Sequence, residues 1–501
     1  MGGGPVARRL AERGLNVLIL DRGGCDARGG KAGDYWKEPL HGVVDGEARV
    51  YHDIMGSAVG GTSVTYAASL ERPERHDLDE GPDRPHPTGG WPVGYDEFRP
   101  YFESAERIFH VCGEPDPLSC EPSPELAAPP PLAPGDAALV AAFRRSGLHP
   151  YRAHVGIRYL PGCTECIGRP CASGCKLDAR TAGVEPALAT GRAALIAGCE
   201  GMALRGVAGR VTHLDARLGV ERVTIPARCV VLSAGGLASP RLLLASASEA
   251  WPDGCGNGSG LVGRNLMFHL SERLAIWPEG RAQLGRPAKT ISLRDFYYRD
   301  GLRLGLLQSM GLDASYGNVV HQLNHKFDRS PLRSLRPLRG ALRVPAFVAS
   351  QLLGAARIFA GILEDPPVAD NRVVFDPANP GRLAFDYRLT PELRRRRQVF
   401  RGIIRASIRG QRAFFLNAEP ELNLPHPCGT LRFGADPRHS VLNPDCRAHD
   451  LSNLYVVDSS FMPTSNGVNP SLTIAANALR VADRIAATFA SVEPARATSA
   501  R

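Results

Sequence analysis

The stretch MGGGPVARRLAERGLNVLILD, residues 1–21, decides the fold class. Three glycines and Pro5 precede a run of helix formers, and after Gly14 an apolar run from Leu15 to Leu20 ends in Asp21. A glycine turn, a helix and a strand that closes on a carboxylate make up the second half of a dinucleotide-binding βαβ unit. The first strand and the first two glycines of G-x-G-x-x-G are absent, so we expect the chain to begin inside the motif.

The composition is that of a globular protein with two or three lobes. The chain has 501 residues, of which 43% are hydrophobic and 22% charged. No uncharged apolar run reaches about 18 residues, which predicts no transmembrane segment. No secretory leader precedes the fold, so the expected location is cytoplasmic, although a signal upstream of the motif stays open.

The positive charge does not predict a nucleic-acid partner. The net charge is +9, arginine carries nearly all of it, and the densest run is Arg394–Arg397. Proteins that bind nucleic acid usually gather basic and aromatic side chains into one stripe. Here the arginines are scattered, and we expect no nucleic acid to bind.

Further glycine loops and short apolar strands follow along the chain. A second glycine loop spans residues 56–63, and a buried strand is predicted at 229–232, before a glycine turn and a helix entered at Ser239-Pro240. A last strand is predicted at 453–458, followed by a helix over 470–487 with apolar residues at helical spacing. The mixed pattern between about 275 and 425 is typical of a lobe that covers a substrate.

Taken in order, these segments resemble the glucose-methanol-choline (GMC) family of FAD-dependent oxidoreductases. The motifs that carry the resemblance are G-x-x-x-G-G-[ST]-S, A-G-G-x-x-S-P-R-L-L, N-L-M-x-H, H-P-C-G-T-L-R-F-G, N-L-Y-V-V-D and G-V-N-P-S-L-T-I. The resemblance implies an α/β fold with a Rossmann-like FAD-binding domain, its first strand missing, and a discontinuous α+β substrate-binding domain. The FAD-binding domain would comprise 1–72, 160–272 and 447–490, and the substrate-binding domain 73–159 and 273–446. Residues 491–501 are expected to form a disordered tail.

The resemblance also implies which residues bind FAD. Gly3 corresponds to the last glycine of the phosphate loop, and Asp21 to the carboxylate that holds the adenosine ribose hydroxyls. Tyr66 departs from the family, because many members have Asn after the second glycine loop. The other implied FAD contacts are Gly56, Gly60, Gly61, Ser63, Asp458, Asn469 and Pro470.

Two residues are implied to be catalytic, His426 of the H-P-C-G-T segment and Asn469. A neutral imidazole can accept an alcohol proton near neutral pH, whereas an amide can only orient the hydroxyl and donate to the developing alkoxide. The base is therefore His426. Asn469-Pro470 is predicted to begin the last helix, with Asn469 at the N-cap. His269 is interpreted as structural or close to the cofactor.

The implied reaction is oxidation of a CH–OH group of a small-molecule alcohol to a carbonyl by hydride transfer to flavin. A dehydrogenase is favoured, with an acceptor protein or a quinone taking the electrons. One alternative is a catalytically impaired flavoprotein remnant of the same fold. Another is a basic protein that binds a membrane surface or nucleic acid through the arginines at 331–357.

Four cysteines lie within thirteen residues in GCTECIGRPCASGCK. Cys163, Cys166, Cys171 and Cys175 follow a C-x2-C-x4-C-x3-C spacing. Thiolates ligate both iron–sulfur clusters and zinc, and the segment is similar to cysteine-rich insertions of electron-transferring dehydrogenases in the family. An iron–sulfur cluster, a zinc ion, and free thiols or a disulfide all stay open.

Four arginines, at 333, 336, 339 and 343, precede the apolar stretch AFVASQLLGAARIFAGIL, residues 346–363. Basic residues beside an apolar helix can indicate a membrane-surface anchor. We favour an ordinary amphipathic helix or a lid, because Pro345 borders the stretch, Arg357 interrupts it, and its apolar residues are not strongly one-sided.

Overall fold

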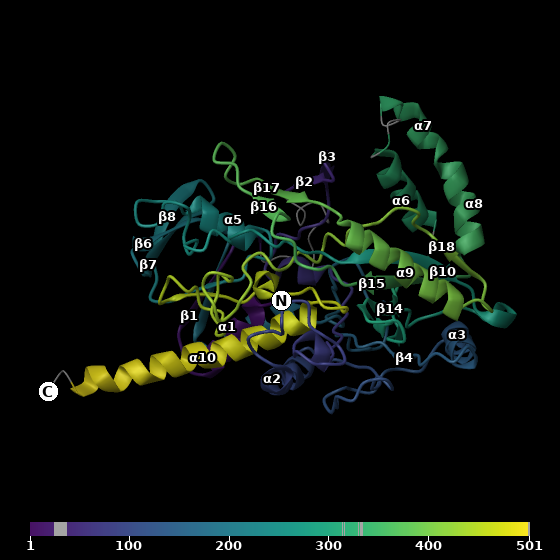
Figure 1. Cartoon of the computed structure of the whole chain (residues 1–501), viewed down its shortest axis with the longest axis horizontal. Coiled ribbons are helices and arrows are strands. Elements are labelled where there is room, and N and C mark those ends of the chain that lie inside the picture. Colours follow the sequence, from purple (N-terminus) through teal and green to yellow (C-terminus); the bar gives the residue numbers. More distant parts are fainter. Residues whose placement is uncertain (25–37, 313, 315, 329, 331–333, 499–501) are drawn as a thin grey trace.

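The computed structural model describes residues 1–24, 38–312, 314, 316–328, 330 and 334–498 (Figure 1). The strands form several separate sheets, among them two parallel strand pairs and one antiparallel six-stranded sheet. Helix α1 (Gly3–Glu12) leads into β1 (Val17–Asp21), which pairs in parallel with β5 (Ala193–Ala197). A second parallel pair joins β9 (Val230–Leu232) to β19 (Leu454–Val456). The predicted α/β class is confirmed.

Helix α10 (Ser471–Thr498) packs against both α1 and α2 (Tyr95–Ile108), and the three share one hydrophobic core. It begins one residue later than predicted, since the Ile474 amide donates to the carbonyl of Pro470. It also continues beyond residue 487 into the segment predicted to be a tail (Figure 1).

A six-stranded sheet forms the second lobe, and helix α9 (Pro391–Ser407) packs on it. The inner strand β15 (Arg357–Leu363), with the sequence RIFAGIL, is buried throughout, which explains why polar and apolar residues do not alternate along it. Leu393, Phe400 and Ile404 of α9 share the core beneath this sheet. In sheet order the strands are β18 (Ala413–Phe415), β10 (Leu270–Ile276), β15 (Arg357–Leu363), β14 (Gly305–Ser309), β11 (Ile291–Leu293) and β4 (Tyr151–Arg152).

The chain also forms a three-stranded and a four-stranded sheet. One is the antiparallel sheet β6 (Cys199–Val207), β7 (Arg210–Leu218) and β8 (Glu221–Pro226). The other has the order β16 (Arg372–Val374), β17 (Leu383–Tyr387), β2 (Leu40–Val44) and β3 (Glu47–Tyr51). Asp45-Gly46, both with positive φ, makes the β2–β3 turn, as expected for a two-residue hairpin loop.

Helices α6 (Tyr316–Asp328), α7 (Arg336–Ala341) and α8 (Arg343–Leu353) form an arm between β14 and β15 (Figure 1). No helix in the described ranges is long and apolar enough to cross a bilayer. The remaining elements are η2 (Gly61–Val64), η3 (Arg75–Asp77), α3 (Pro134–Arg145), η4 (Arg180–Val184), α4 (Glu185–Ala189), α5 (Ala238–Ala245), η5 (Glu279–Arg281), β12 (Tyr298–Arg299), β13 (Leu302–Arg303) and η7 (Ser459–Phe461).

Candidate active site

The N-terminus of α1 has the properties of a phosphate-binding helix end. Gly2 at the N-cap makes no side-chain cap, and the first turn, which contains Gly3, holds no acidic residue. The first amides of the helix are therefore left for a ligand, and the helix dipole favours an anion there. A side chain at Gly4 would lie 2.0 Å from the Ala179 carbonyl oxygen, so glycine is required where α1 approaches η4.

The second glycine loop turns back next to the same helix end. Gly60 and Gly61 have φ values of 102° and 58°, in the left-handed region that favours glycine. The Ser63 hydroxyl donates to the Gly60 carbonyl (2.6 Å) and accepts from the Ala179 amide (3.0 Å). The Gly56 amide donates to the Thr62 hydroxyl (3.1 Å). Ser63 thus ties the loop to the segment that also contacts α1.

Asp21 ends β1, and the next residue, Arg22, lines a cavity. Oδ1 of Asp21 accepts from the Gly23 amide (2.8 Å), and burial raises the pKa of the Asp21 carboxyl group. Arg22, Ser57 and Gly198 are among the residues that line the cavity. Glycine backbone, an uncapped helix end and a carboxylate at the end of β1 together fit FAD.

Asp458 lies two residues after β19 and bonds to the glycine turn that follows β9. Its carboxylate accepts hydrogen bonds from the Gly235 amide (3.0 Å), the Ser239 hydroxyl, and the amide and hydroxyl of Ser460. The structure therefore shows Asp458 holding the glycine turn after β9. A side chain at Gly236 would lie 2.4 Å from the Pro427 carbonyl oxygen, so this turn packs directly on the residue after His426.

His426 lies beside His269, because Met267 and Cys428 form an antiparallel bridge with mutual backbone hydrogen bonds of 3.0 Å. The two Nδ1 atoms are 3.1 Å apart, and the rings meet edge to face. His269 is fully buried, and its Nε2 lies 3.0 Å from the Asn466 carbonyl oxygen.

This contact assigns the tautomers of both rings. A carbonyl oxygen only accepts, so Nε2 of His269 carries its proton and Nδ1 is an acceptor in the neutral ring. Burial lowers the pKa of His269 to about 4, which keeps the ring neutral at pH 7. His426 therefore donates from Nδ1 to His269, and its Nε2 is left as a lone-pair acceptor with no partner among the described residues.

A second chain of hydrogen bonds orients Asn469. Nζ of Lys289, which only donates, lies 3.3 Å from Oε1 of Gln308, and the Ser69 hydroxyl donates to the same oxygen (3.1 Å). Nε2 of Gln308 must then face Asn469, where it donates to Oδ1 (2.7 Å). Nδ2 of Asn469 is consequently turned away from Gln308, and it has no partner in the described part of the chain. The side chain of Asn469 takes part in this series of hydrogen bonds. It does not cap α10, which differs from the prediction.

Electrostatics keep His426 in the form that accepts a proton. Burial is the main cause that lowers the pKa of His426 well below its usual value, and repulsion from a protonated His269 and from Lys289 adds to it. Lys289 is buried, and burial lowers the pKa of its amine to about 8. Lys289 thus acts on His426 through its charge and on Asn469 through Gln308.

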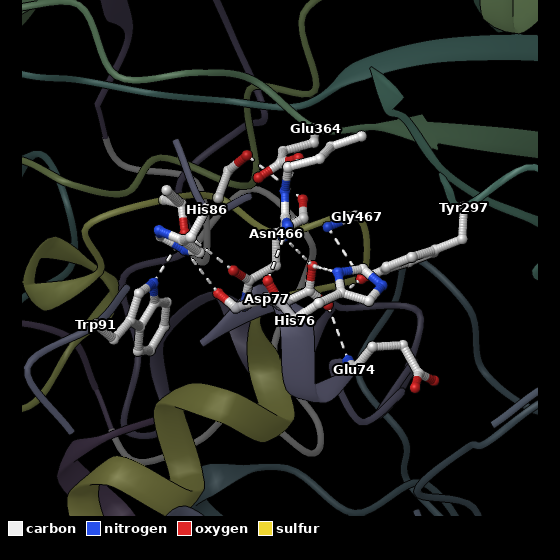
Figure 2. A network of polar contacts seen from close by, with 12 residues as sticks. Glu74, His76, Asp77, His86, Trp91, Tyr297, Glu364, Asn466 and Gly467 are labelled. Atoms are coloured by element: carbon white, nitrogen blue, oxygen red, sulfur yellow. Dashed lines mark hydrogen bonds and ion pairs between the residues drawn. The ribbon is translucent and has the colours of Figure 1, made fainter. Parts of the chain in front are cut away.

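A buried polar network supports the turn that leads to Asn469, as Figure 2 shows. The Tyr297 hydroxyl donates to Asp77 and accepts from the Gly467 amide (3.2 Å), and Trp91 donates to Thr464 (2.8 Å). A side chain at Gly467 would meet the Tyr297 ring at 2.8 Å, so this position requires glycine. Trp91 and Tyr297 thus brace residues 464–467, whose Asn466 carbonyl accepts from His269.

The cysteine-rich segment supports Lys289 but is not assembled as a metal centre. The Cys163 thiol lies beside that of Cys175, and Cys171 beside Cys166; all four are free. Within the described ranges, no three Cys, His, Asp or Glu side chains are grouped to hold a metal ion. The structure therefore gives no support to the predicted iron–sulfur or zinc site.

Glu165 of that segment holds the backbone at Lys289. Its buried carboxylate accepts from the amides of Ala288 (2.8 Å) and Lys289 (3.1 Å) and pairs with Arg286 (3.0 Å). Sequence reasoning missed Glu165, Gln308 and Lys289. The one available signal was rarity, because the chain has only five lysines, and the two whose burial the structure describes, Lys176 and Lys289, are both buried.

Comparisons with known proteins show the family and the fold. The family described as GMC oxidoreductase matches with its N-terminal part over residues 35–271 and with its C-terminal part over 367–478. Paromamine 6'-oxidase from Streptomyces fradiae is 30% identical over 97% of this chain and 89% of its own length. 2-Methyl-1,2-propanediol dehydrogenase from Mycolicibacterium austroafricanum is 29% identical over 88% and 82%. The solved structure of pyridoxine 4-oxidase from Mesorbium loti has a TM-score of 0.65 at 19% identity, over 96% and 97% of the two chains, which shows the same fold.

Proposed function

Because this chain belongs to the GMC oxidoreductase family and is thus an FAD-dependent enzyme that oxidises CH–OH groups, we propose that His426 is its catalytic base. Asn469 would donate a hydrogen bond to the developing alkoxide. The observation that carries the proposal is the pair of hydrogen-bond chains. One leaves Nε2 of His426 as an acceptor, and the other leaves Nδ2 of Asn469 as a donor. An alcohol oxygen needs both, an acceptor for its proton and a donor for the charge that develops on it.

The cofactor would be held by the N-terminal end of α1, by Asp21 and by the two glycine loops. The amides at the start of α1, including that of Gly3, would bind the pyrophosphate, and Asp21 the ribose hydroxyls. Gly56, Gly60 and Gly61 let the backbone pass close to the cofactor, while Ser63 and Asp458 hold the two loops in place. Pro470, directly before α10, would bring that helix end to the flavin. When bound, FAD supplies the acceptor for the hydride.

The chain's own residues carry out the proton chemistry. The substrate hydroxyl donates to Nε2 of His426 and accepts from Nδ2 of Asn469. As the O–H bond breaks, its proton passes to Nε2, and negative charge on the oxygen is stabilised by Asn469 and by the imidazolium. The carbinol C–H bond then breaks with both electrons leaving as hydride, and the remaining C–O bond becomes a carbonyl. His269 holds the base in the required tautomer throughout.

His269 acts as a positioning residue, and comparing His269→Ala with His269→Gln tests this role. Alanine removes the acceptor for Nδ1–H of His426, and we expect kcat to fall roughly 10- to 100-fold because the base loses its tautomer and orientation. Glutamine can accept from His426 and donate to Asn466, so it should recover most of the rate. Steady-state kinetics and bound-flavin absorbance check this. Equal loss in both variants would contradict the assignment.

Lys289→Met should move the acid limb of the pH profile. The pKa of His426 lies below its ordinary value of about 6.5, so the neutral base persists as the pH falls and is lost only on passing through the lowered pKa. Removing the Lys289 charge raises that pKa, and the acid limb of kcat/KM should shift to higher pH. Lys289→Arg keeps the charge and should leave the limb in place. A limb that does not move in Lys289→Met would contradict the coupling.

The substrate and the electron acceptor stay predictions. The alcohols named by the relatives, paromamine, 2-methyl-1,2-propanediol and pyridoxine, are the first substrates to test. The expectation of a dehydrogenase acting with an acceptor protein or quinone rested partly on a metal cluster that the structure does not support. Comparing oxygen uptake with reduction of a quinone analogue decides between oxidase and dehydrogenase.

A further inference from the structure

Helices α7 and α8 of the arm between β14 and β15 expose their apolar side chains. α7 buries none of its residues, and α8 buries only Ala346 and Ser350, one turn apart. The opposite face of α8 carries Val344, Phe347, Val348 and Leu352, which are 70%, 58%, 52% and 59% exposed. These positions repeat at three and four residues, so they form one continuous stripe that faces solvent.

The base of the arm explains why this arrangement is stable. Leu353 and Ala356 pack with Ile358 of β15, with Trp277, which follows β10, and with Leu416, which follows β18. Val319 of α6 belongs to the same cluster, so the base of the arm is anchored on the sheet. Figure 1 shows α7 and the start of α8 standing well away from both lobes. Apolar stripes that a fold leaves exposed at such a place mark interaction sites.

The charge of the residues in and around α7 and α8 indicates which kind of partner this surface binds. Residues 329–355 contain five arginines and no Asp or Glu. Arg336, Arg339 and Arg343 are exposed beside the stripe. Arg339 pairs with Asp328 (3.1 Å), whereas Arg336 and Arg343 have no partner among the described residues. A helix with an apolar face and a purely basic flank fits the interface of an anionic bilayer.

We propose that α7 and α8 bind an anionic membrane surface, with Val344, Phe347, Val348 and Leu352 inserted among the lipids and Arg336 and Arg343 against the headgroups. The helices lie on the membrane and do not cross it. This replaces the sequence-based preference for an ordinary amphipathic helix, because the apolar face is turned away from the protein. The inference does not depend on the alcohol-oxidising site.

Vesicle co-sedimentation of the full chain tests the proposal. We expect binding to vesicles that contain phosphatidylglycerol, weak binding to pure phosphatidylcholine, and release by high salt. Phe347→Ser with Leu352→Ser should lower partitioning about tenfold or more, because two apolar side chains no longer enter the lipid. Arg336→Gln and Arg343→Gln should each lower it about fivefold.

Matched controls come from the β7–β8 turn, where Val220 is 97% exposed. Val220→Ser and Arg222→Gln make the same chemical changes at a site remote from the arm and should not alter binding. Circular dichroism and FAD content establish that each variant is folded. Equal binding by the arm variants and the wild type would overturn the proposal. So would sedimentation velocity showing that the arm variants abolish self-association without changing vesicle binding, because a second copy would then be the occupant.

Discussion

His426→Ala is expected to lower kcat by a factor of about 10² to 10⁴ without loss of FAD. The alanine variant cannot accept the alcohol proton, and no other described side chain offers an acceptor at that place. His269 cannot substitute, because its Nδ1 faces His426 and its Nε2 is committed to Asn466. Rapid-mixing measurement of flavin reduction by a substrate alcohol gives this rate directly.

Flavin content separates chemistry from folding in this experiment. His426 is half-buried in a loop between backbone-paired segments, so its truncation should not unfold the protein. His439→Ala, at a position whose side chain is 74% exposed, is the matched control and should reduce flavin at the wild-type rate. A His426→Ala variant that is reduced within a few-fold of the wild-type rate would remove His426 from the mechanism.

Asn469→Ala is expected to lower kcat by about 10² to 10³, the effect of losing a donor to a developing oxyanion. The loss should be in kcat more than in KM, because the negative charge exists only as the proton leaves. Asn469→Asp has nearly the same shape but no donor, and its carboxylate would repel the alkoxide.

The aspartate variant therefore distinguishes hydrogen bonding from packing. Gln308 can still donate to it through Nε2, so the local structure should persist. If Asn469→Asp kept wild-type kcat, Asn469 would be a packing residue, and the donor would have to come from elsewhere. Steady-state kinetics with flavin-saturated protein measure both variants.

Much of the first lobe could be predicted from the sequence, because its signals are local. The glycine turn, helix and strand of residues 1–21 became α1 and β1, and the strands predicted at 229–232 and 453–458 became β9 and β19. Their roles in binding FAD stay predictions. The antiparallel sheet β6–β8 was not anticipated, since its strands carry mixed polar and apolar residues.

The proposed catalytic arrangement needed the structure, because its contacts are distant in sequence. Gln308 and Asn469 are 161 positions apart, and His269 and His426 are 157 apart. No spacing rule connects such residues. The resemblance implied His426 and Asn469, but the tautomer of one and the amide orientation of the other follow only from Asn466, Gln308 and Lys289.

The cysteine segment shows why spacing alone misleads. A C-x2-C-x4-C-x3-C pattern is compatible with one metal centre, but Glu165 and Cys166 adopt positive φ values of 61° and 47° within it. The loop turns Glu165 inward to the amides of Ala288 and Lys289, and the thiols meet in two pairs. The segment supports the active site through a carboxylate, which no cysteine motif would indicate.

Anaerobic reduction of the FAD-bound protein by alcohols is the most direct test of the central claim. Paromamine, 2-methyl-1,2-propanediol and pyridoxine should be tried first, with wild type and His426→Ala side by side. The account predicts that an alcohol bleaches the flavin absorbance of the wild type, with a carbonyl product, and that His426→Ala binds FAD but is reduced at least about 100-fold more slowly. A chain that binds no FAD, or two proteins reduced at the same rate, would contradict it.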